Sequence, residues 1–226
     1  MIPDSVNWPS PDELAAVHRE VRWPNGCEYA DFYSRVAERA EWSSFVEIGA
    51  HCGVSAAHLF GKLKERGGDF VITCVDTWQT EPDINEYGAT VGKRLEKKIG
   101  AKIRHPLGTA FVLFCANVSK AGAFSRRGDV SERQRVDVLL LDSVSASRAF
   151  DPQSVDFVYI DGAHDYTSVC ADIMAWLPIV RPGGMIAGHD YCRHDFGVRR
   201  AVDLFFPNAE IDPNTRFGDG VWMVQL

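Results

Sequence analysis

The fold of this chain is decided by the stretch Phe45-Val46-Glu47-Ile48-Gly49-Ala50-His51-Cys52-Gly53 and by the residues that follow it. The apolar run at 45–48 predicts a buried strand that ends at Gly49. A helix is expected over residues 55–66, stopped by the glycines at 67 and 68, and residues 70–75 form a second β-rich run that ends at Asp76. A strand, a glycine loop, a helix and another strand open a doubly wound parallel sheet.

The rest of the chain continues the same alternation of strands and helices. Further strands are expected at 136–141, 155–160, 185–188 and 221–226, and helices at 111–118, 167–177 and 198–206. The sequence Arg-Pro-Gly-Gly at 181–184 predicts a turn that leads into the strand at 185–188. Most strands should be parallel and the last one antiparallel.

Two segments lie outside this alternation. Residues 1–44 predict an N-terminal helical cap, with apolar residues at helical spacing over 12–21 and 29–40. The polar segment 79–105 is long for a loop inside a domain, and we expect it to form a lid-like insertion. The main domain is therefore predicted to span residues 45–226.

Composition excludes several classes of protein. The 226 residues are 46% hydrophobic and 24% charged, as in an ordinary globular domain, and the net charge of −7 argues against general nucleic-acid binding. No apolar stretch approaches the ~20 residues of a membrane span, and no signal peptide is recognisable. The six cysteines form no Cys-x-x-Cys pair, so we expect reduced thiols and a cytoplasmic location.

The first glycine loop favours one class of nucleotide ligand. A dinucleotide fingerprint needs glycine where this chain has His51 and Val54, so the spacing fails. The acidic Glu47 would repel a pyrophosphate but suits a positively charged ligand, and Asp76 can accept both hydroxyls of a ribose. Together these residues favour S-adenosylmethionine (SAM) over NAD, although Asp76 could also be a helix cap or a surface acid.

The second half of the chain adds carboxylates and imidazoles at two strand ends. Asp161-Gly162-Ala163-His164 follows the strand at 155–160, and His189-Asp190 follows the strand at 185–188. Ligands of α/β proteins bind at the carboxyl ends of such strands. These groups can hold a metal ion and move a proton. Alternatively, His189-Asp190 only bonds the backbone at a strand end, and His164 only begins a helix.

These motifs resemble a known family. Residues 45–53, 71–78 and 155–191 look like a class I SAM-dependent methyltransferase, and the match extends over roughly residues 44–206. The blocks 159–166, 181–184 and 188–191 are similar to those of one branch of this family, the small metal-dependent O-methyltransferases that act on sugar hydroxyls. That branch includes proteins described as macrocin O-methyltransferase-like and cephalosporin hydroxylase-like. The resemblance implies a single Rossmann-like α/β domain with a mostly parallel, doubly wound, seven-stranded sheet and an antiparallel last strand.

The resemblance also implies roles for individual residues. The metal ligands would be Asp161, His189 and Asp190, and His164 would be the catalytic base, with Asp161 beside it. Glu47 and Gly49 would lie by the methionine part of SAM, Asp76 would hold the ribose, and Asp142 would lie near the adenine. The implied SAM-binding set is Glu47, Gly49, His51, Gly53, Asp76, Thr77, Trp78, Asp142, Ser143 and Asp161.

The chemistry fits transfer of a methyl group to a hydroxyl. A divalent cation bound to an alcohol lowers its pKa, and a histidine accepts the proton near neutral pH. Mg²⁺ is the expected ion, although the imidazole of His189 suits Mn²⁺, iron or zinc better. If His189 points away, two aspartates and waters would surround Mg²⁺.

The leading hypothesis is a SAM-dependent O-methyltransferase whose acceptor is a small molecule, such as a sugar or glycoside. It implies no nucleic-acid or membrane partner and allows a homo-oligomer. A second hypothesis is a SAM-binding partner protein without catalysis, against which the complete acid–base set argues. A third is a nicotinamide-dependent oxidoreductase, which the failed glycine spacing disfavours.

Overall fold

The computed structural model describes residues 29–79, 107–123, 133–193, 197–215 and 218–226, with the single positions Pro9, Leu14 and Lys97. The helix expected over 12–21 and nearly all of the lid-like segment 79–105 therefore lie outside the described residues. In the part of the chain that is described, no helix has the length and apolar character needed to cross a membrane.

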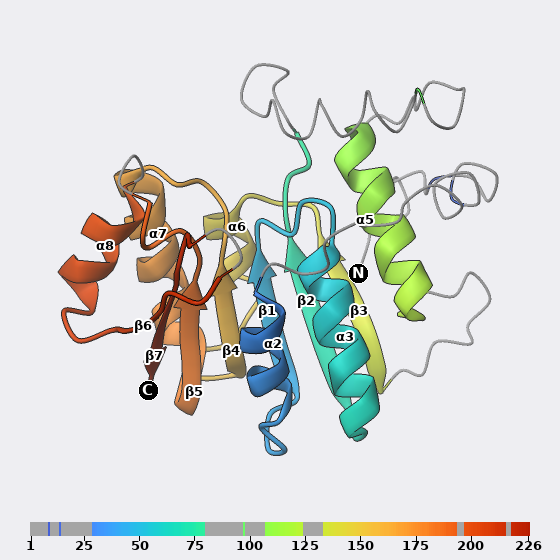
Figure 1. The fold of residues 1–226 in the computed structure, drawn as a ribbon, viewed down its shortest axis with the longest axis horizontal. Coiled ribbons are helices and arrows are strands. Elements are labelled where there is room, and N and C mark those ends of the chain that lie inside the picture. The colour runs from blue at the N-terminus through green and yellow to red at the C-terminus, as the bar shows by residue number, and fades with distance from the viewer. Residues whose placement is uncertain are drawn as a thin grey trace.

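A seven-stranded sheet organises the fold, in the order β3-β2-β1-β4-β5-β7-β6. Strands β1 to β5 pair in parallel, so their arrowheads point to one edge of the sheet in Figure 1, whereas β7 is antiparallel to both β5 and β6. The predicted α/β sheet, mostly parallel with an antiparallel last strand, is confirmed. The strands are β1 (Ser44–Ile48), β2 (Phe70–Val75), β3 (Gln134–Leu139), β4 (Val155–Ile160), β5 (Val180–Gly188), β6 (Glu210–Asp212) and β7 (Val221–Gln225).

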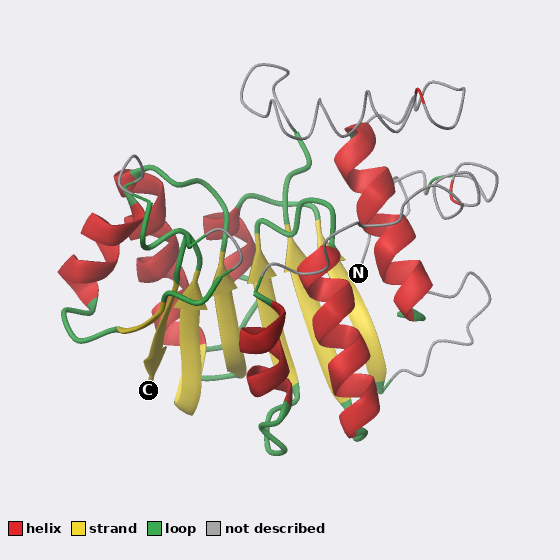
Figure 2. Cartoon of the chain, viewed as in Figure 1, coloured by secondary structure: helices red, strands yellow, loops and turns green. Residues whose placement is uncertain are grey.

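Helices cover both faces of the sheet (Figure 2). One hydrophobic cluster joins the sheet to α2, α3 and α5, and a second joins it to α6, α7 and α8. The buried apolar residues of the strands therefore pack against helices on one face or the other, as expected for a doubly wound sheet. The helices are α2 (Ala30–Ala37), α3 (Val54–Arg66), α5 (Gly108–Ala121), α6 (Ser143–Ser147), α7 (Tyr166–Trp176) and α8 (Val198–Phe205), with a 3-10 turn at Leu177–Ile179.

The described part of the N-terminal region shares the main core. Phe32 and Tyr33 of α2 are buried against the rings of Phe157 and Tyr159 in β4, with centroid separations of 5.1–6.2 Å. Every residue of β4 is buried, so this central strand anchors both faces. Helix α2 thus packs on the sheet face and brings its N-terminal end toward the carboxyl ends of the strands.

The structure corrects two strand boundaries. The strand expected at 136–141 is Gln134–Leu139, because its ladder with β2 ends at the pair of Val75 with Leu139. The expected turn at 181–184 lies within β5, where the pairing with β4 shifts register after Val155. There Gly183 adopts a positive φ of 82° and its amide donates to the carbonyl of Leu226.

Two short elements were not predicted. Helix α6 contains five residues, and strand β6 contains three, so neither is long enough to show a periodic apolar pattern. Asp142 begins α6 by accepting a hydrogen bond from the amide of Ser145 at 2.9 Å. Aspartate is a preferred residue at the start of a helix, so Asp142 was a local signal in the sequence that a helix begins there.

Candidate active site

At the carboxyl edge of the sheet, the first residue of each of four loops is still hydrogen-bonded to a neighbouring strand. The first residue after each of β1, β2, β4 and β5 donates its amide to the neighbouring strand, which extends the ladder by one step. These bonds join Gly49 to Val75 (2.9 Å), Asp76 to Leu139 (3.2 Å), Asp161 to Ile48 (2.9 Å) and His189 to Ile160 (3.2 Å). Four of the predicted site residues therefore start from fixed positions, next to the point where the strand order reverses.

The glycines of the first loop allow close contacts within the protein. Gly49 has a φ of 81°, and a Cβ placed on it would lie 2.0 Å from the carbonyl oxygen of Asp161. Gly53 has a φ of 67°, and its Cβ would lie 2.5 Å from the ring of Phe114. Gly49 thus brings the loop after β1 directly against the loop after β4.

Asp76 ties the first two loops together. Its Oδ2 accepts the amide of His51 at 2.8 Å, and its Oδ1 accepts the amide of Trp78 at 2.7 Å. The indole of Trp78 in turn donates to the carbonyl of His51 at 2.7 Å. Each carboxylate oxygen can accept a further hydrogen bond, so Asp76 keeps acceptor capacity beyond these two bonds.

Glu47 is a buried carboxyl group at the end of β1. Its side chain is 2% exposed, and its Oε1 accepts a hydrogen bond from the hydroxyl of Ser55. Its Oε2 has no hydrogen-bond partner among the described residues. Burial, with the nearby charges of Asp161 and Asp76, raises the pKa of Glu47 to about 8 despite the bond from Ser55.

The other predicted SAM neighbours make hydrogen bonds within the protein, two of them near their own position and one to α7. Thr77 accepts the amide of Gln79 through its hydroxyl at 3.3 Å. Asp142 is exposed at the start of α6. The hydroxyl of Ser143 accepts the indole N–H of Trp176 at 2.9 Å. The structure places all three at the same carboxyl edge, after β2 and β3.

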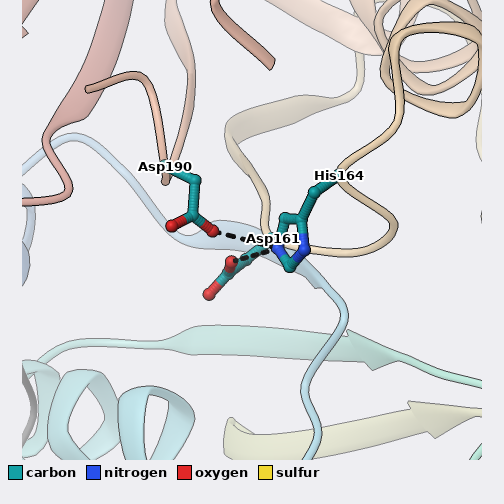
Figure 3. Close-up of side chains that lie close together, drawn as sticks. All are labelled: Asp161, His164 and Asp190. Atoms are coloured by element: carbon teal, nitrogen blue, oxygen red, sulfur yellow. Dashed lines mark ion pairs between the residues drawn. The ribbon is translucent and has the colours of Figure 1, made fainter. Parts of the chain in front are cut away.

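Asp161, His164 and Asp190 come together from two different loops (Figure 3). The Nε2 atom of His164 lies 3.0 Å from Oδ2 of Asp190 and 3.7 Å from Oδ1 of Asp161, so both carboxylates face the same imidazole nitrogen. The His164 loop is held by the amide of Gly197, which donates to the His164 carbonyl at 2.7 Å. Asp190 adopts a positive φ of 61°, a conformation that few non-glycine residues adopt.

His189 faces the same two carboxylates. Its Nδ1 lies 3.5 Å from Oδ2 of Asp190 and 3.8 Å from Oδ1 of Asp161, and the side chain is 7% exposed. Ligand atoms that share one transition-metal ion at about 2.1 Å stand roughly 3–3.5 Å apart. The distances from His189 lie at or slightly beyond that spacing, and among the described residues it is His164 that groups with Asp161 and Asp190 as possible metal ligands, whereas His189 groups with Asp190 and Asp219.

The two carboxylates change the charge of their imidazole neighbours. Burial alone would lower the pKa of His164, but hydrogen bonds and charge from Asp161 and Asp190 outweigh it and raise this pKa to about 9. Burial would likewise raise the pKa of Asp190, yet His164 and His189 hold it well below its usual range. The two carboxylates therefore favour the protonated form of the His164 imidazole.

Sequence reasoning missed two residues at this site. Tyr29 donates its hydroxyl to Oδ2 of Asp161 at 2.9 Å, and its ring lies 4.8 Å from that of His189. Asp219 groups with His189 and Asp190 as a further set of possible metal ligands within 4.8 Å of one another. No motif marks Tyr29, whereas the glycines on both sides of Asp219 were a usable sign of a special loop.

Comparisons with known proteins agree with this architecture. Residues 46–191 match a family model described as a methyltransferase domain. The fold is similar to that of an O-methyltransferase from Bacillus cereus in complex with SAH, with a TM-score of 0.56 and 17% identity over 96% of this chain and 92% of that one. It is also similar to the O-methyltransferase TomG of tomaymycin synthesis from Streptomyces achromogenes in complex with SAM, with a TM-score of 0.53 and 15% identity over 98% of this chain and 92% of that one.

A relative in sequence is an uncharacterized protein of Sinorhizobium fredii, which is 27% identical over 157 residues. The aligned part covers 68% of this chain but only 14% of that protein. The chain therefore spans a small fraction of that relative's length.

Proposed function

The chain belongs to the methyltransferase-domain family, and on that premise we propose that it is a SAM-dependent methyltransferase that methylates a hydroxyl group of a small molecule. The observation that carries the proposal is the convergence of Asp161, His164, His189 and Asp190 after β4 and β5. A sugar or glycoside is the acceptor class that we favour, on the resemblance in the motifs alone.

The residues of the first loop fit SAM. The buried Oε2 of Glu47, which has no hydrogen-bond partner among the described residues, suits the positive charge of this ligand. A nearby cation favours the ionised carboxylate and so opposes the raised pKa of Glu47. Asp76 keeps acceptor capacity for the ribose, and Thr77 and Trp78 would lie beside it, with Asp142 and Ser143 near the adenine. SAM supplies the methyl group as an electrophile.

The donor set fits a divalent cation. Asp161 and Asp190 offer one carboxylate oxygen each toward a common point, and His189 adds a neutral nitrogen when its Nδ1 is unprotonated. Such a mixture of oxygen and nitrogen donors is typical of Mn²⁺, iron or zinc, whereas Mg²⁺ prefers oxygen alone. A cation there would lower the pKa of a bound hydroxyl group.

His164 is the residue that we assign as general base. Its Nε2 lies beside the carboxylates, 3.0 Å from Asp190, so a hydroxyl held near them would be within reach of it. A base must be unprotonated, and the raised pKa of His164 comes from those same two carboxylates. Positive charge placed between them opposes that rise, which is why the proposal couples the base to a cation.

The test is methyl transfer from SAM, measured as release of SAH over a panel of alcohols, sugars and glycosides. Each acceptor is assayed with Mg²⁺, with Mn²⁺ and with EDTA. The proposal expects transfer that EDTA abolishes and that His164→Ala reduces. The matched control is His58→Ala, which removes an imidazole from α3 that bonds the carbonyl of Ala30 outside the site. Full activity of His164→Ala at saturating acceptor would remove the base assignment.

A further inference from the structure

We propose that Tyr29 is a positioning residue for the metal ligands Asp161 and His189, an inference that rests on the proposed metal-dependent function. Tyr29 directly precedes α2 and lies 132 residues before Asp161 in the chain. It also lies before the residues matched by the methyltransferase family model, which begin at residue 46. The structure thus supplies a part of the site from outside the matched domain.

The hydroxyl of Tyr29 determines which oxygen of Asp161 faces the cluster. It donates to Oδ2 at 2.9 Å, while Oδ1 is the atom that lies 3.8 Å from His189 and 3.7 Å from His164. A carboxylate that is not held can turn its two oxygens about the Cβ–Cγ bond. With Oδ2 bonded to the phenol, Oδ1 is left as the single donor toward the cation.

The ring of Tyr29 restrains the other ligand. Its centroid lies 4.8 Å from that of His189, in a tilted arrangement of 50°. The ring of Tyr29 also packs against the rings of Tyr33 and Tyr159, with centroid separations of 5.4 and 5.3 Å. The phenol therefore stands between the buried aromatic core and the imidazole, so His189 has less freedom to rotate away from the carboxylates.

Groups that orient metal ligands in this way have measurable effects. Removing such a partner lowers metal affinity or activity by about 10–100-fold. Tyr29→Phe removes the hydroxyl and keeps the ring, so it tests the bond to Asp161 without opening a cavity. Tyr33→Phe is the matched control, because it removes the hydroxyl of a neighbouring buried ring in the same cluster.

The experiment measures Mn²⁺ binding to the full chain by electron paramagnetic resonance of the free aqueous ion, and SAM binding by calorimetry. We expect Tyr29→Phe to weaken Mn²⁺ binding about tenfold or more, with SAM affinity unchanged, and Tyr33→Phe to bind both as the wild type does. Wild-type Mn²⁺ affinity in Tyr29→Phe would overturn the inference. Equal loss of SAM and Mn²⁺ binding would also overturn it, because that result indicates general structural damage. A wild-type protein that transfers methyl groups but binds no Mn²⁺ would overturn the metal requirement itself, which is a distinguishable result.

Discussion

The contact between Gly49 and the loop after β4 yields a quantitative prediction. Gly49 has a φ of 81°, and a Cβ added to it would lie 2.0 Å from the Asp161 carbonyl oxygen and 2.8 Å from the Cα of Gly162. Both of these are backbone atoms that the sheet holds, because the Asp161 amide bonds the carbonyl of Ile48. Gly49→Ala must therefore displace one of the two loops.

The magnitude follows from a comparison within the chain. Gly68 has nearly the same φ, 82°, but a Cβ added there meets no atom of the described residues within 4 Å. Both substitutions lose about 1–2 kcal/mol for an L residue in the left-handed region. Only Gly49→Ala adds overpacking, which costs about 1–3 kcal/mol in an ordered interior. We therefore expect Gly49→Ala to lose roughly 2–5 kcal/mol of unfolding free energy and Gly68→Ala about 1–2.

Urea unfolding, followed by tryptophan fluorescence, measures the unfolding free energy of each variant. Titration with Mn²⁺ measures the metal affinity of the site. The displaced loop carries Asp161, so Gly49→Ala should also lower the methyl-transfer rate, by about 100-fold for a displacement near 1 Å. Gly68→Ala should leave both Mn²⁺ affinity and rate unchanged. Equal losses of stability in the two variants would refute the reasoning, because the clash at Gly49 would then have no effect.

Three further predictions address the site and its surroundings. His164→Gln should slow methyl transfer by about 10²–10⁴-fold with unchanged SAM affinity by calorimetry; a wild-type rate would contradict the base assignment. His189→Asp replaces a nitrogen donor by oxygen, so the ratio of Mn²⁺ to Mg²⁺ affinity in competition titrations should fall about tenfold, and an unchanged ratio would mean that the imidazole is not a ligand. Burial, partly offset by a bond from Ser143, raises the pKa of Asp172 to about 6, above the value of about 3.9 in an unfolded chain. The folded chain then binds more protons between these values and loses stability as pH rises through them. Asp172→Asn should stabilise the protein by roughly 3 kcal/mol at pH 8 and by almost nothing below about pH 4, whereas a gain independent of pH in urea unfolding would exclude this cause.

The parallel core and its strand ends were predictable from the sequence because each depends on local pattern. Buried strands such as β4 are continuous apolar runs, and the residues that follow them must emerge at one edge of the sheet. That rule was sufficient to group Asp161, His164, His189 and Asp190. The sequence could not show which way His189 points, since that depends on the ring of Tyr29 from a distant part of the chain.

The errors have a common physical origin in long-range pairing. Residues 181–184 have the composition of a turn, but the ion pair of Arg181 with Asp156 and the bonds of Gly183 and Gly184 to Leu226 hold them in an irregular strand. The end of β3 is set by the length of β2 beside it. Local composition contains none of these partners, so it cannot fix either boundary.

Methyl transfer requires the donor and the acceptor to stand in line. The rate therefore depends more on the distance between their binding sites than on the affinity of either site for its ligand. In this fold that distance is set by backbone. Glu47 ends β1 and Asp161 follows β4, the two strands are adjacent and parallel, and Ile48 pairs with Ile160. The ladder then continues for one residue into the loops through the amide of Asp161. The SAM half and the acceptor half of the proposed site are therefore joined through paired backbone. A substitution that shifts their backbone contact at Gly49 should consequently reduce the rate more than it reduces the affinity for SAM or for the metal alone.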